Sequence, residues 1–264
     1  MGSMLSKNDL LDYRTFGDYY QIEKDYLQDL ILHEIYSKSK EDFVFKGGTA
    51  LSKFYYSDRF SEDLDFTLRK PAGHEISKYV ESLLSGIVSG FVYKTIYRGK
   101  PKMNNFGTIE TALLIEGPRF TGKQSTLQSI RLEIGTKSSL MLKPLALPRA
   151  PIYADAANYV ALVMDKTEIL AEKFRALLSK GRFHKERDLY DIYFLLSKET
   201  SINRKIVYAK LAESGIKFSQ KELLDTIGRI HETWEALRPM VKHNLEKYDY
   251  VKDFVNERIE KARL

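Results

Sequence analysis

Three prolines within eight residues divide this chain into two parts with different patterns of apolar residues. They are Pro144, Pro148 and Pro151. Because proline lacks an N–H and fixes φ, this segment cannot continue a helix or a central strand. Before it, β-rich runs alternate with helical patterns; beyond it, helical spacing prevails to the end. We expect an α+β fold, with a mixed β-sheet and flanking helices at 5–142, a proline-rich connection at 143–151, and a mostly helical C-terminal domain at 152–264.

The spacing of apolar residues also predicts the individual elements. Helices are expected at 18–37, 49–56 and 75–87, and strands at 43–45, 64–68, 91–98, 108–115 and 126–136. After a strand-like run at 159–164, further helices are expected at 168–179, 187–196, 205–212, 220–237 and 244–262.

Composition excludes some classes of protein. The 264 residues include no cysteine, so neither a disulfide framework nor a thiolate metal site is possible. With no secretory signal, this favours a reducing cytoplasm, and no apolar run approaches the roughly 18 residues of a membrane span. The net charge of +6 is compatible with a polyanionic partner. Gly2, Ser3 and Met4 are interpreted as a cloning remnant.

Two aspartates, one residue apart, lie at the start of the strand expected at 64–68. Side chains alternate along a strand, so Asp63 and Asp65 project from one face while Leu64 and Phe66 enter the core. Two carboxylates this close repel each other unless a cation lies between them, and Mg²⁺ is commonly held by one or two carboxylates plus substrate phosphates. The alternative is a solvated edge strand.

A glycine pair precedes the helix expected at 49–56. Gly47 and Gly48 would let backbone N–H groups approach a phosphate at the helix N-terminus, with a hydroxyl added by Thr49 or Ser52. When the glycines are taken alone, a tight turn explains them better. In this order and spacing, the glycines and aspartates together are more specific for a phosphate ligand and a metal ion than either is alone.

The combination resembles the signature of the nucleotidyltransferase superfamily, in which Gly-Gly, a short helix and Asp-x-Asp are followed by a third carboxylate on a neighbouring strand. Here that position matches Glu133, within an alternating run in which Ile130, Leu132 and Ile134 face inward. Glu133 would bind metal or accept a proton from the attacking hydroxyl. Alternatively, Arg131 and Glu133 form a pair on a polar sheet face.

A closer resemblance is to the AbiEii/AbiGii toxin family, which includes the MenT-type toxins. Its members carry Phe-Lys-Gly-Gly-Thr-x-Leu and then Arg-x-Ser-x-Asp-hydrophobic-Asp. The matching residues here are Phe45, Lys46, Gly47, Gly48, Thr49, Leu51, Arg59, Ser61, Asp63 and Asp65. The later motifs Ala-Glu-Lys-x-x-Ala and Arg-Asp-hydrophobic-x-Asp match Ala171, Glu172, Lys173, Ala176, Arg187, Asp188, Leu189 and Asp191. Where many members have Lys-x-Asp on the third acidic strand, this chain has Arg131-x-Glu133.

The later motifs suggest a second group of site residues. Lys173 lies at the margin of an apolar helix stripe, from which it would reach a phosphate or simply extend into solvent. Asp188 and Asp191 share a flank of the next helix beside Arg187. We expect Asp188 to be functional and Asp191 to be mostly structural.

The resemblance implies a toxin of a toxin–antitoxin system that transfers a nucleoside monophosphate from an NTP to RNA, with a tRNA 3′ end as acceptor. It implies one or two Mg²⁺ ions on Asp63 and Asp65, nucleotide contacts from Lys46, Arg59 and Ser61, and an antitoxin partner. The alternatives are a small-molecule hydroxyl acceptor or a catalytically silent nucleotide- or RNA-binding module.

Two basic loops provide candidate RNA contacts. The predicted cations are Arg98, Lys100, Lys102, Arg119 and Lys123, with the rings of Tyr97, Phe106 and Phe120 beside them. Together they would line one phosphate-binding groove with rings for base stacking.

Overall fold

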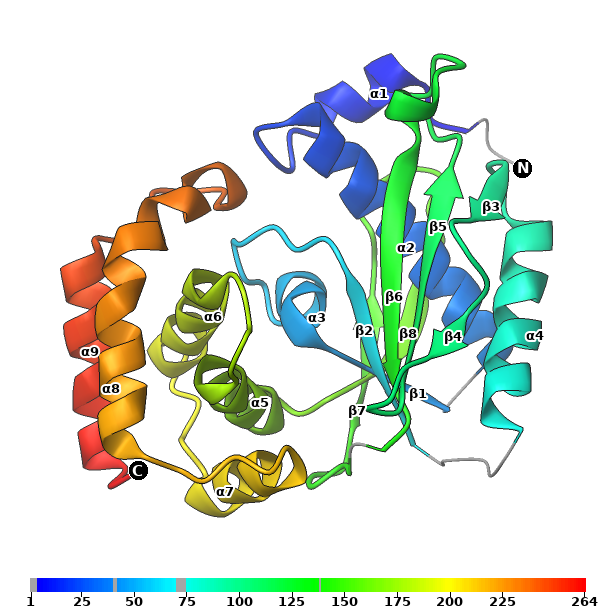
Figure 1. Ribbon diagram of the computed structural model, residues 1–264. Helices are drawn as coiled ribbons and strands as arrows, with labels where there is room; N and C mark the ends of the chain where they lie inside the picture. Colours follow the sequence, from blue (N-terminus) through cyan, green and yellow to red (C-terminus); the bar gives the residue numbers. More distant parts are fainter. Residues whose placement is uncertain (1–3, 40–41, 70–74, 138) are drawn as a thin grey trace. The chain divides into compact units, whose positions relative to one another are not determined.

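The computed structural model describes residues 4–39, 42–69, 75–137 and 139–264, which form two compact units (Figure 1). Unit 1 consists of Met1–Phe54, Phe60–Leu140 and Pro144–Val163. Unit 2 consists of Tyr55–Arg59, Met141–Lys143 and Met164–Leu264. The interpretation of Gly2 and Ser3 as a cloning remnant falls outside the described residues. Within those residues, no helix combines the length and apolar character needed to cross a bilayer.

Unit 1 contains a single mixed β-sheet. Its strands are β1 Phe43–Lys46, β2 Leu64–Leu68, β3 Thr95–Tyr97, β4 Lys102–Met103, β5 Thr108–Ile115, β6 Gln128–Gly135, β7 Leu145–Arg149 and β8 Tyr159–Val163. The order is β3-β5-β6-β2-β1-β8-β7, with β4 also paired to β5. The pairs β2/β6 and β1/β8 are parallel and the others are antiparallel, so the expected mixed sheet is confirmed.

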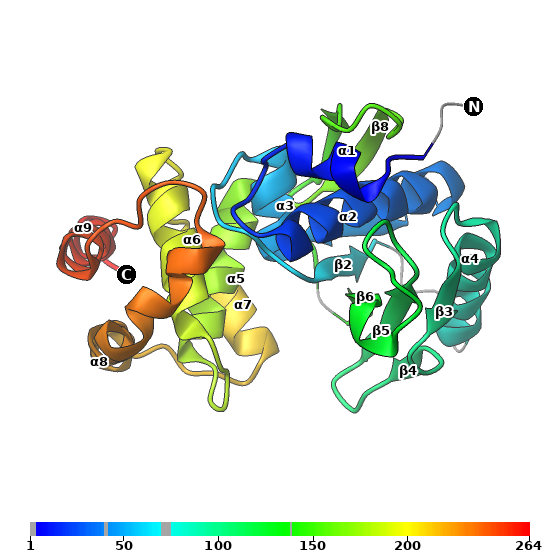
Figure 2. The same ribbon diagram turned by 90° about the horizontal axis from the view of Figure 1, so that it is seen from above.

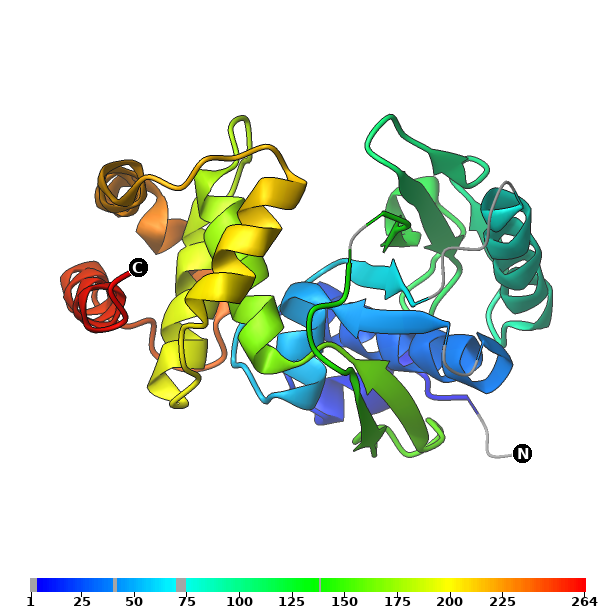
Figure 3. The ribbon, with the colours of Figure 1, turned by 90° about the horizontal axis from the view of Figure 1, so that it is seen from below.

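Helices cover the apolar face of this sheet. The helical segments of unit 1 are α1 Lys7–Asp12, α2 Tyr19–Ser39, α3 Gly47–Phe54, α4 Ile76–Gly90 and the 3₁₀ turn η1 Gln124–Thr126. The long helix α2 packs across β6 and β8, and α4 packs beside α2 and against β3 (Figures 2 and 3). Leu64 and Phe66 of β2 and Ile130, Leu132 and Ile134 of β6 are buried, as their alternation predicts.

The proline-rich segment differs from its sequence interpretation, because it contains strand β7 instead of a connection. β7 pairs antiparallel with β8 and stands last in the strand order, with Pro148 opposite Val160. An edge strand tolerates proline because the missing N–H faces away from the ladder. The sheet therefore continues to Val163, beyond the expected boundary at 142.

A buried group of charges fixes α3 against α2 and β7. The Lys53 ammonium of α3 lies 2.9 Å from Asp25 Oδ1 and 3.0 Å from Asp29 Oδ2, and its side chain is 1% exposed. The Arg149 guanidinium of β7 donates to both Asp29 oxygens at 3.2 and 3.1 Å. Burial raises the pKa of Asp29, but Lys53 and Arg149 outweigh it and hold the pKa below its usual value. This arrangement anchors the helix that begins at Gly47.

Unit 2 is helical. Its elements are α5 Lys166–Leu178, α6 Lys185–Ser197, α7 Arg204–Glu213, α8 Gln220–Arg229, the 3₁₀ helix η2 Ile230–Met240 and α9 Tyr248–Lys261. The helix expected at 220–237 is thus two segments, with the change from α to 3₁₀ at Ile230. The core is formed by Phe174, Leu177, Leu189, Ile192, Trp234, Leu237, Val251 and Val255.

Candidate active site

Strand register places four charged side chains in a line on the sheet face opposite the apolar core of unit 1. Lys46 of β1 pairs with Asp65 of β2, Asp65 with Glu133 of β6, and Glu133 with Glu110 of β5. Residues directly opposite on neighbouring strands point the same way, and such strands lie about 4.8 Å apart. We call Asp65, Glu133 and Glu110 the acidic row.

Glu110 is a residue that sequence reasoning missed. It is exposed on β5, between the buried Ile109 and the largely buried Thr111, so its outward direction follows from alternation. Its place beside Glu133 depends on the antiparallel register of β5 and β6, which no local pattern contains. Asn104 Nδ2 donates to Glu110 Oε1 at 2.5 Å.

Asp63 precedes β2 and is bound by an arginine fork from β6. Arg131 Nε donates to Asp63 Oδ1 at 3.1 Å, and Nη2 donates to Oδ2 at 2.9 Å. Arg131 Nε also lies 3.7 Å from Glu133 Oε1. The hydrogen bond to Asp63 is the largest influence on Arg131 and raises its pKa, so the guanidinium stays charged. The strand thus presents an Arg131–Glu133 pair beside both aspartates.

Gly47 brings the start of α3 directly against Asp65. Its φ is +76°, a conformation that favours glycine, and a Cβ there would lie 2.2 Å from Asp65 Oδ2. A side chain at position 47 would therefore occupy the space of the Asp65 carboxylate. The first turn of α3, containing Gly47 and Gly48, has backbone N–H groups with no partner inside the helix. An acid and an anion-binding helix terminus are in contact here.

One predicted nucleotide contact, Thr49, has another role in the structure. The Thr49 hydroxyl is buried and donates to the Asp63 backbone oxygen at 2.5 Å, so it fixes the approach to β2. The Ser61 backbone oxygen accepts from Gln28 Nε2 of α2 at 3.0 Å. Ser52 and the Ser61 side chain are half-buried. These contacts hold the Asp63–Asp65 segment in place.

The donor set suits a magnesium ion held jointly with substrate phosphates. Asp63, Asp65 and Glu133 offer the carboxylate oxygens that Mg²⁺ prefers, beside a backbone cradle that a Cβ would fill. Within the described ranges, no three His, Cys, Asp or Glu side chains are grouped so that they could hold a metal ion by themselves. One or two carboxylates completed by phosphates is the usual arrangement for this ion.

The second predicted group forms a buried ion-pair network in unit 2. Arg59 donates from Nε and Nη2 to the two Asp191 oxygens at 2.8 and 2.7 Å. Lys173 Nζ lies 2.9 Å from Asp188 Oδ1 and 2.7 Å from Asp191 Oδ2. Arg182 Nε donates to Asp188 Oδ2 at 2.5 Å. Three cations therefore enclose two carboxylates.

The network keeps all its members charged. Burial raises the pKa of Asp188, but Lys173 and Arg182 outweigh it and bring the pKa to about 2. Burial likewise raises the pKa of Asp191, which Arg59 and Lys173 hold below its usual value. For Lys173, burial lowers the pKa and the two carboxylates more than restore it.

Two expectations about this network need correction. Arg59, predicted to contact nucleotide, is 2% exposed, and its fork is bound to Asp191. The sequence also placed Arg187 beside the two aspartates, whereas their arginine partners are Arg59 and Arg182. Arg59 is far from the aspartates in sequence, which is why local spacing pointed to the wrong arginine.

The two basic loops predicted to share one RNA groove lie at different positions along β5. Arg98, Lys100 and Lys102 precede this strand, while Arg119 and Lys123 follow it. The Arg98 N–H donates to the Ala112 backbone oxygen in the middle of β5, and Lys102 pairs with Glu110, whereas Arg119 and Lys123 lie beyond the strand's end at Ile115. The Arg119 guanidinium makes a cation–π contact with Tyr20, at 5.5 Å from the ring centroid. That these loops line one groove stays a prediction.

Residues 30–257 match the family described as "Nucleotidyl transferase AbiEii toxin, Type IV TA system". The chain belongs to this family. The AbiEii match extends the resemblance through the C-terminal helices, where the sequence motifs had ended at Leu196. As a member, the chain is a nucleotidyltransferase enzyme of a type IV toxin–antitoxin family.

Solved structures share the AbiEii chain's fold at low sequence identity. JHP933 from Helicobacter pylori is 17% identical with a TM-score of 0.55, covering 92% of this chain and 93% of that one. A candidate nucleotidyltransferase from H. pylori is 16% identical with a TM-score of 0.57, covering 92% and 96%. No curated protein matches the sequence. At these identities the likeness concerns the fold.

Proposed function

We propose that this enzyme transfers a nucleoside monophosphate from an NTP to the 3′-hydroxyl of a tRNA, with release of pyrophosphate. The observation that carries the proposal is the contact between the Asp65 carboxylate and the backbone of Gly47 at the start of α3. An anion-binding helix terminus beside two carboxylates suits a nucleotide triphosphate with its metal ion.

Each site residue of unit 1 has a definite role in this proposal. Asp63 and Asp65 would hold one or two Mg²⁺ ions, and the N–H groups of Gly47 and Gly48 would receive the phosphates. Mg²⁺ neutralises phosphate charge and polarises the attacking hydroxyl when bound. Glu133, beside Asp65, accepts the proton as the hydroxyl oxygen bonds to the α-phosphorus and the bond to pyrophosphate breaks.

Lys173 has one ammonium hydrogen left for a substrate. Its contacts with Asp188 and Asp191 use two of the three N–H bonds, and within the described part of the chain no further partner is present. We propose that the third contacts an NTP phosphate, while Asp188 and Asp191 orient the amine. The cognate antitoxin implied by the family would block this reaction in the cell.

The experiment is a transfer assay with Mg²⁺, each of the four α-labelled NTPs and total tRNA. The proposal predicts label on RNA, with pyrophosphate released in equal amount. Label on small hydroxyl compounds alone would contradict the RNA acceptor, and nucleotide binding without pyrophosphate release would contradict catalysis.

Matched variants connect the assay to the site. Asp65→Asn keeps the shape of the side chain and removes the charge, so labelling should be lost. Glu62→Gln makes the same change at a neighbouring acid outside the acidic row, and it should keep labelling near the wild-type rate. Equal loss in both variants would contradict a specific role for Asp65.

A further inference from the structure

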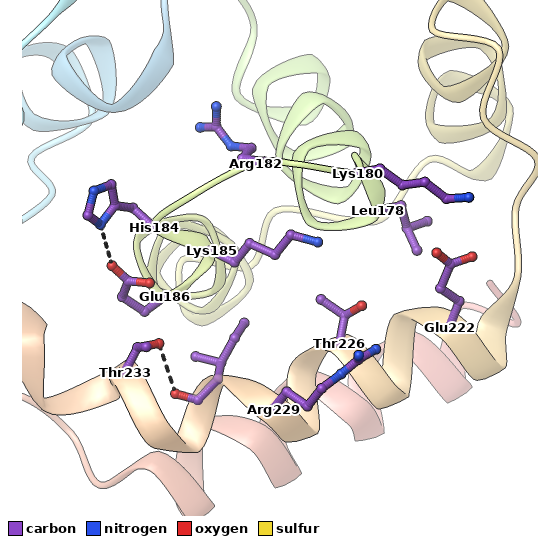
Figure 4. A pocket seen from close by; sticks show the side chains of 11 residues that line it. Leu178, Lys180, Arg182, His184, Lys185, Glu186, Glu222, Thr226, Arg229 and Thr233 are labelled. Atoms are coloured by element: carbon purple, nitrogen blue, oxygen red, sulfur yellow. Dashed lines mark hydrogen bonds and ion pairs between the residues drawn. The ribbon is translucent and has the colours of Figure 1, made fainter.

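A basic pocket lies within unit 2, between the α5–α6 loop and helix α8 (Figure 4). Its cavity volume is about 430 Å³. Its charged lining residues are Lys180, Arg182, Lys185, Arg229, Glu186 and Glu222. Lys180 and Lys185 reach in from the side of α5 and α6, opposite Glu222 and Arg229 on α8 (Figure 4).

The cations of this pocket exceed its acids, and most of them lack an acidic partner. Arg182 is paired with Asp188 of the ion-pair network. Lys185 Nζ donates to the Leu177 backbone oxygen at 2.6 Å, and Arg229 Nε to the Asp225 backbone oxygen at 3.2 Å. Among the residues that the structure describes, Lys180, Lys185 and Arg229 have no carboxylate oxygen within 4.0 Å.

The surroundings of Lys185 lower its pKa, although Glu222 and Asp188 act to raise it. Burial lowers the pKa of Lys185, and the positive charge of Arg229 lowers it further. Of the two acids that line the pocket, Glu186 is buried and lies 3.1 Å from His184 Nδ1. An anion in the cavity would relieve the repulsion, as a bound phosphate does between clustered Lys and Arg side chains.

An exposed aromatic ring stands in the same loop. Phe183 is 82% exposed, between Arg182 and His184 in sequence. Exposing a phenyl ring to water is unfavourable in a free protein, and rings beside cations are how proteins bind single-stranded nucleic acid. In such proteins a ring stacks on a base while cations contact the backbone phosphates. Apolar ring and unpaired cations thus indicate one class of ligand.

We propose that the basic pocket binds a backbone phosphate of the acceptor RNA, with Phe183 stacking on a neighbouring base. This inference rests on the proposed function, because the proposed function is what identifies the bound RNA as the acceptor. The lining residues come from segments 178–186 and 222–233 of unit 2, whereas sequence reasoning assigned RNA to the loops at 98–102 and 119–123 of unit 1.

The test measures binding of fluorescent tRNA by anisotropy, over a series of salt concentrations and without NTP. All proteins carry Asp65→Asn, so that no transfer occurs. Adding Lys180→Gln with Arg229→Gln should weaken binding at least tenfold and reduce the slope of log K against log salt by about 1 to 2. Phe183→Ala should weaken binding about tenfold with an unchanged slope.

Two controls make the result specific. Lys205→Gln on α7 removes an exposed cation that has no ion-pair partner among the described residues, and it should leave the affinity and slope nearly unchanged. Lys100→Gln with Lys123→Gln tests the loops of unit 1. Thermal unfolding of each variant checks that it is folded.

The outcomes separate the pocket from the proposed reaction. Wild-type affinity and slope in the Lys180/Arg229 and Phe183 variants would overturn the pocket, even if the active enzyme labels RNA. Weakened NTP binding in these variants, with RNA binding intact, would assign the pocket to a free nucleotide and also overturn it. If RNA binding falls as expected but wild-type enzyme labels no RNA, the pocket stands and the proposed reaction fails.

Discussion

Two groups of carboxylates were both candidates for the catalytic site, and their surroundings differ. In unit 2, Asp188 and Asp191 are completely buried, and three cations contact them. In unit 1, the acidic row lies on a half-open sheet face, and the Asp63 side chain beside it is 29% exposed.

The difference in burial predicts opposite consequences of mutation. A buried acid enclosed by cations contributes to folding, because removing it leaves charges buried without partners. A partly exposed acid near other acids contributes little to folding. Because the neighbouring carboxylates repel one another, a cation bound between them is favourable. The predictions below compare these two groups.

The largest effect is expected at Asp65. Asp65→Asn should lower the rate of nucleotide transfer by about 10²–10⁴, comparable to losses from other electrostatic catalytic groups. The free energy of unfolding should change by less than about 1 kcal/mol, because the site is partly exposed. Steady-state labelling and urea unfolding measure the two quantities. A stability loss as large as that of a buried acid would remove the contrast between the groups.

The second-largest effect is expected on the free energy of unfolding, at Asp191. Asp191→Ala leaves Arg59 and Lys173 without this partner inside unit 2, at a cost of about 3–5 kcal/mol. Urea unfolding followed by circular dichroism gives this value. The double variant with Arg59→Met should recover part of the loss, since it removes one of the unpaired charges. Loss without recovery would argue against the Arg59 ion pair as the cause.

The pH dependence of stability sharpens the comparison. The Asp188 pKa is about 2 in the folded protein, below its unfolded value of about 3.9, so its contribution is present above the unfolded value. About 2 kcal/mol should be lost as the pH falls from about 5 to 1. Asp188→Asn should remove this part of the pH profile. An unchanged profile in the variant would assign the acid sensitivity to other carboxylates.

The smallest effect is expected at Glu110, at the outer end of the acidic row. Glu110→Gln should lower the transfer rate less than tenfold, because Glu133 stands between this residue and Asp65. Rates measured over a range of Mg²⁺ concentrations would show whether Glu110 acts through metal affinity. A loss equal to that of Asp65→Asn would move the centre of the site toward β5.

Local patterns were sufficient to predict the direction of several site residues. Alternation of apolar residues placed Asp65 and Glu133 outside the core, and the glycine pair located the start of α3. The α+β class followed from the change in periodicity along the chain. These inferences depend only on neighbours within a few residues.

Features that depend on distant partners could not be predicted in this way. Glu110 joins the acidic row only through the β5/β6 register, and Arg59 meets Asp191 across 132 positions of sequence. Pro148 excludes a central strand but not an edge strand, and the sequence alone did not reveal that β7 is at the edge. The basic pocket combines a loop with a helix that follows it much later.

The central claim is tested most directly by Mn²⁺ binding, followed by electron paramagnetic resonance in the presence of a non-hydrolysable NTP analogue. The wild type should bind Mn²⁺ with the nucleotide, Asp65→Asn should weaken that binding at least tenfold, and Glu62→Gln should match the wild type. Equal Mn²⁺ affinity in the wild type and Asp65→Asn would contradict a metal ion held by this acid beside Gly47.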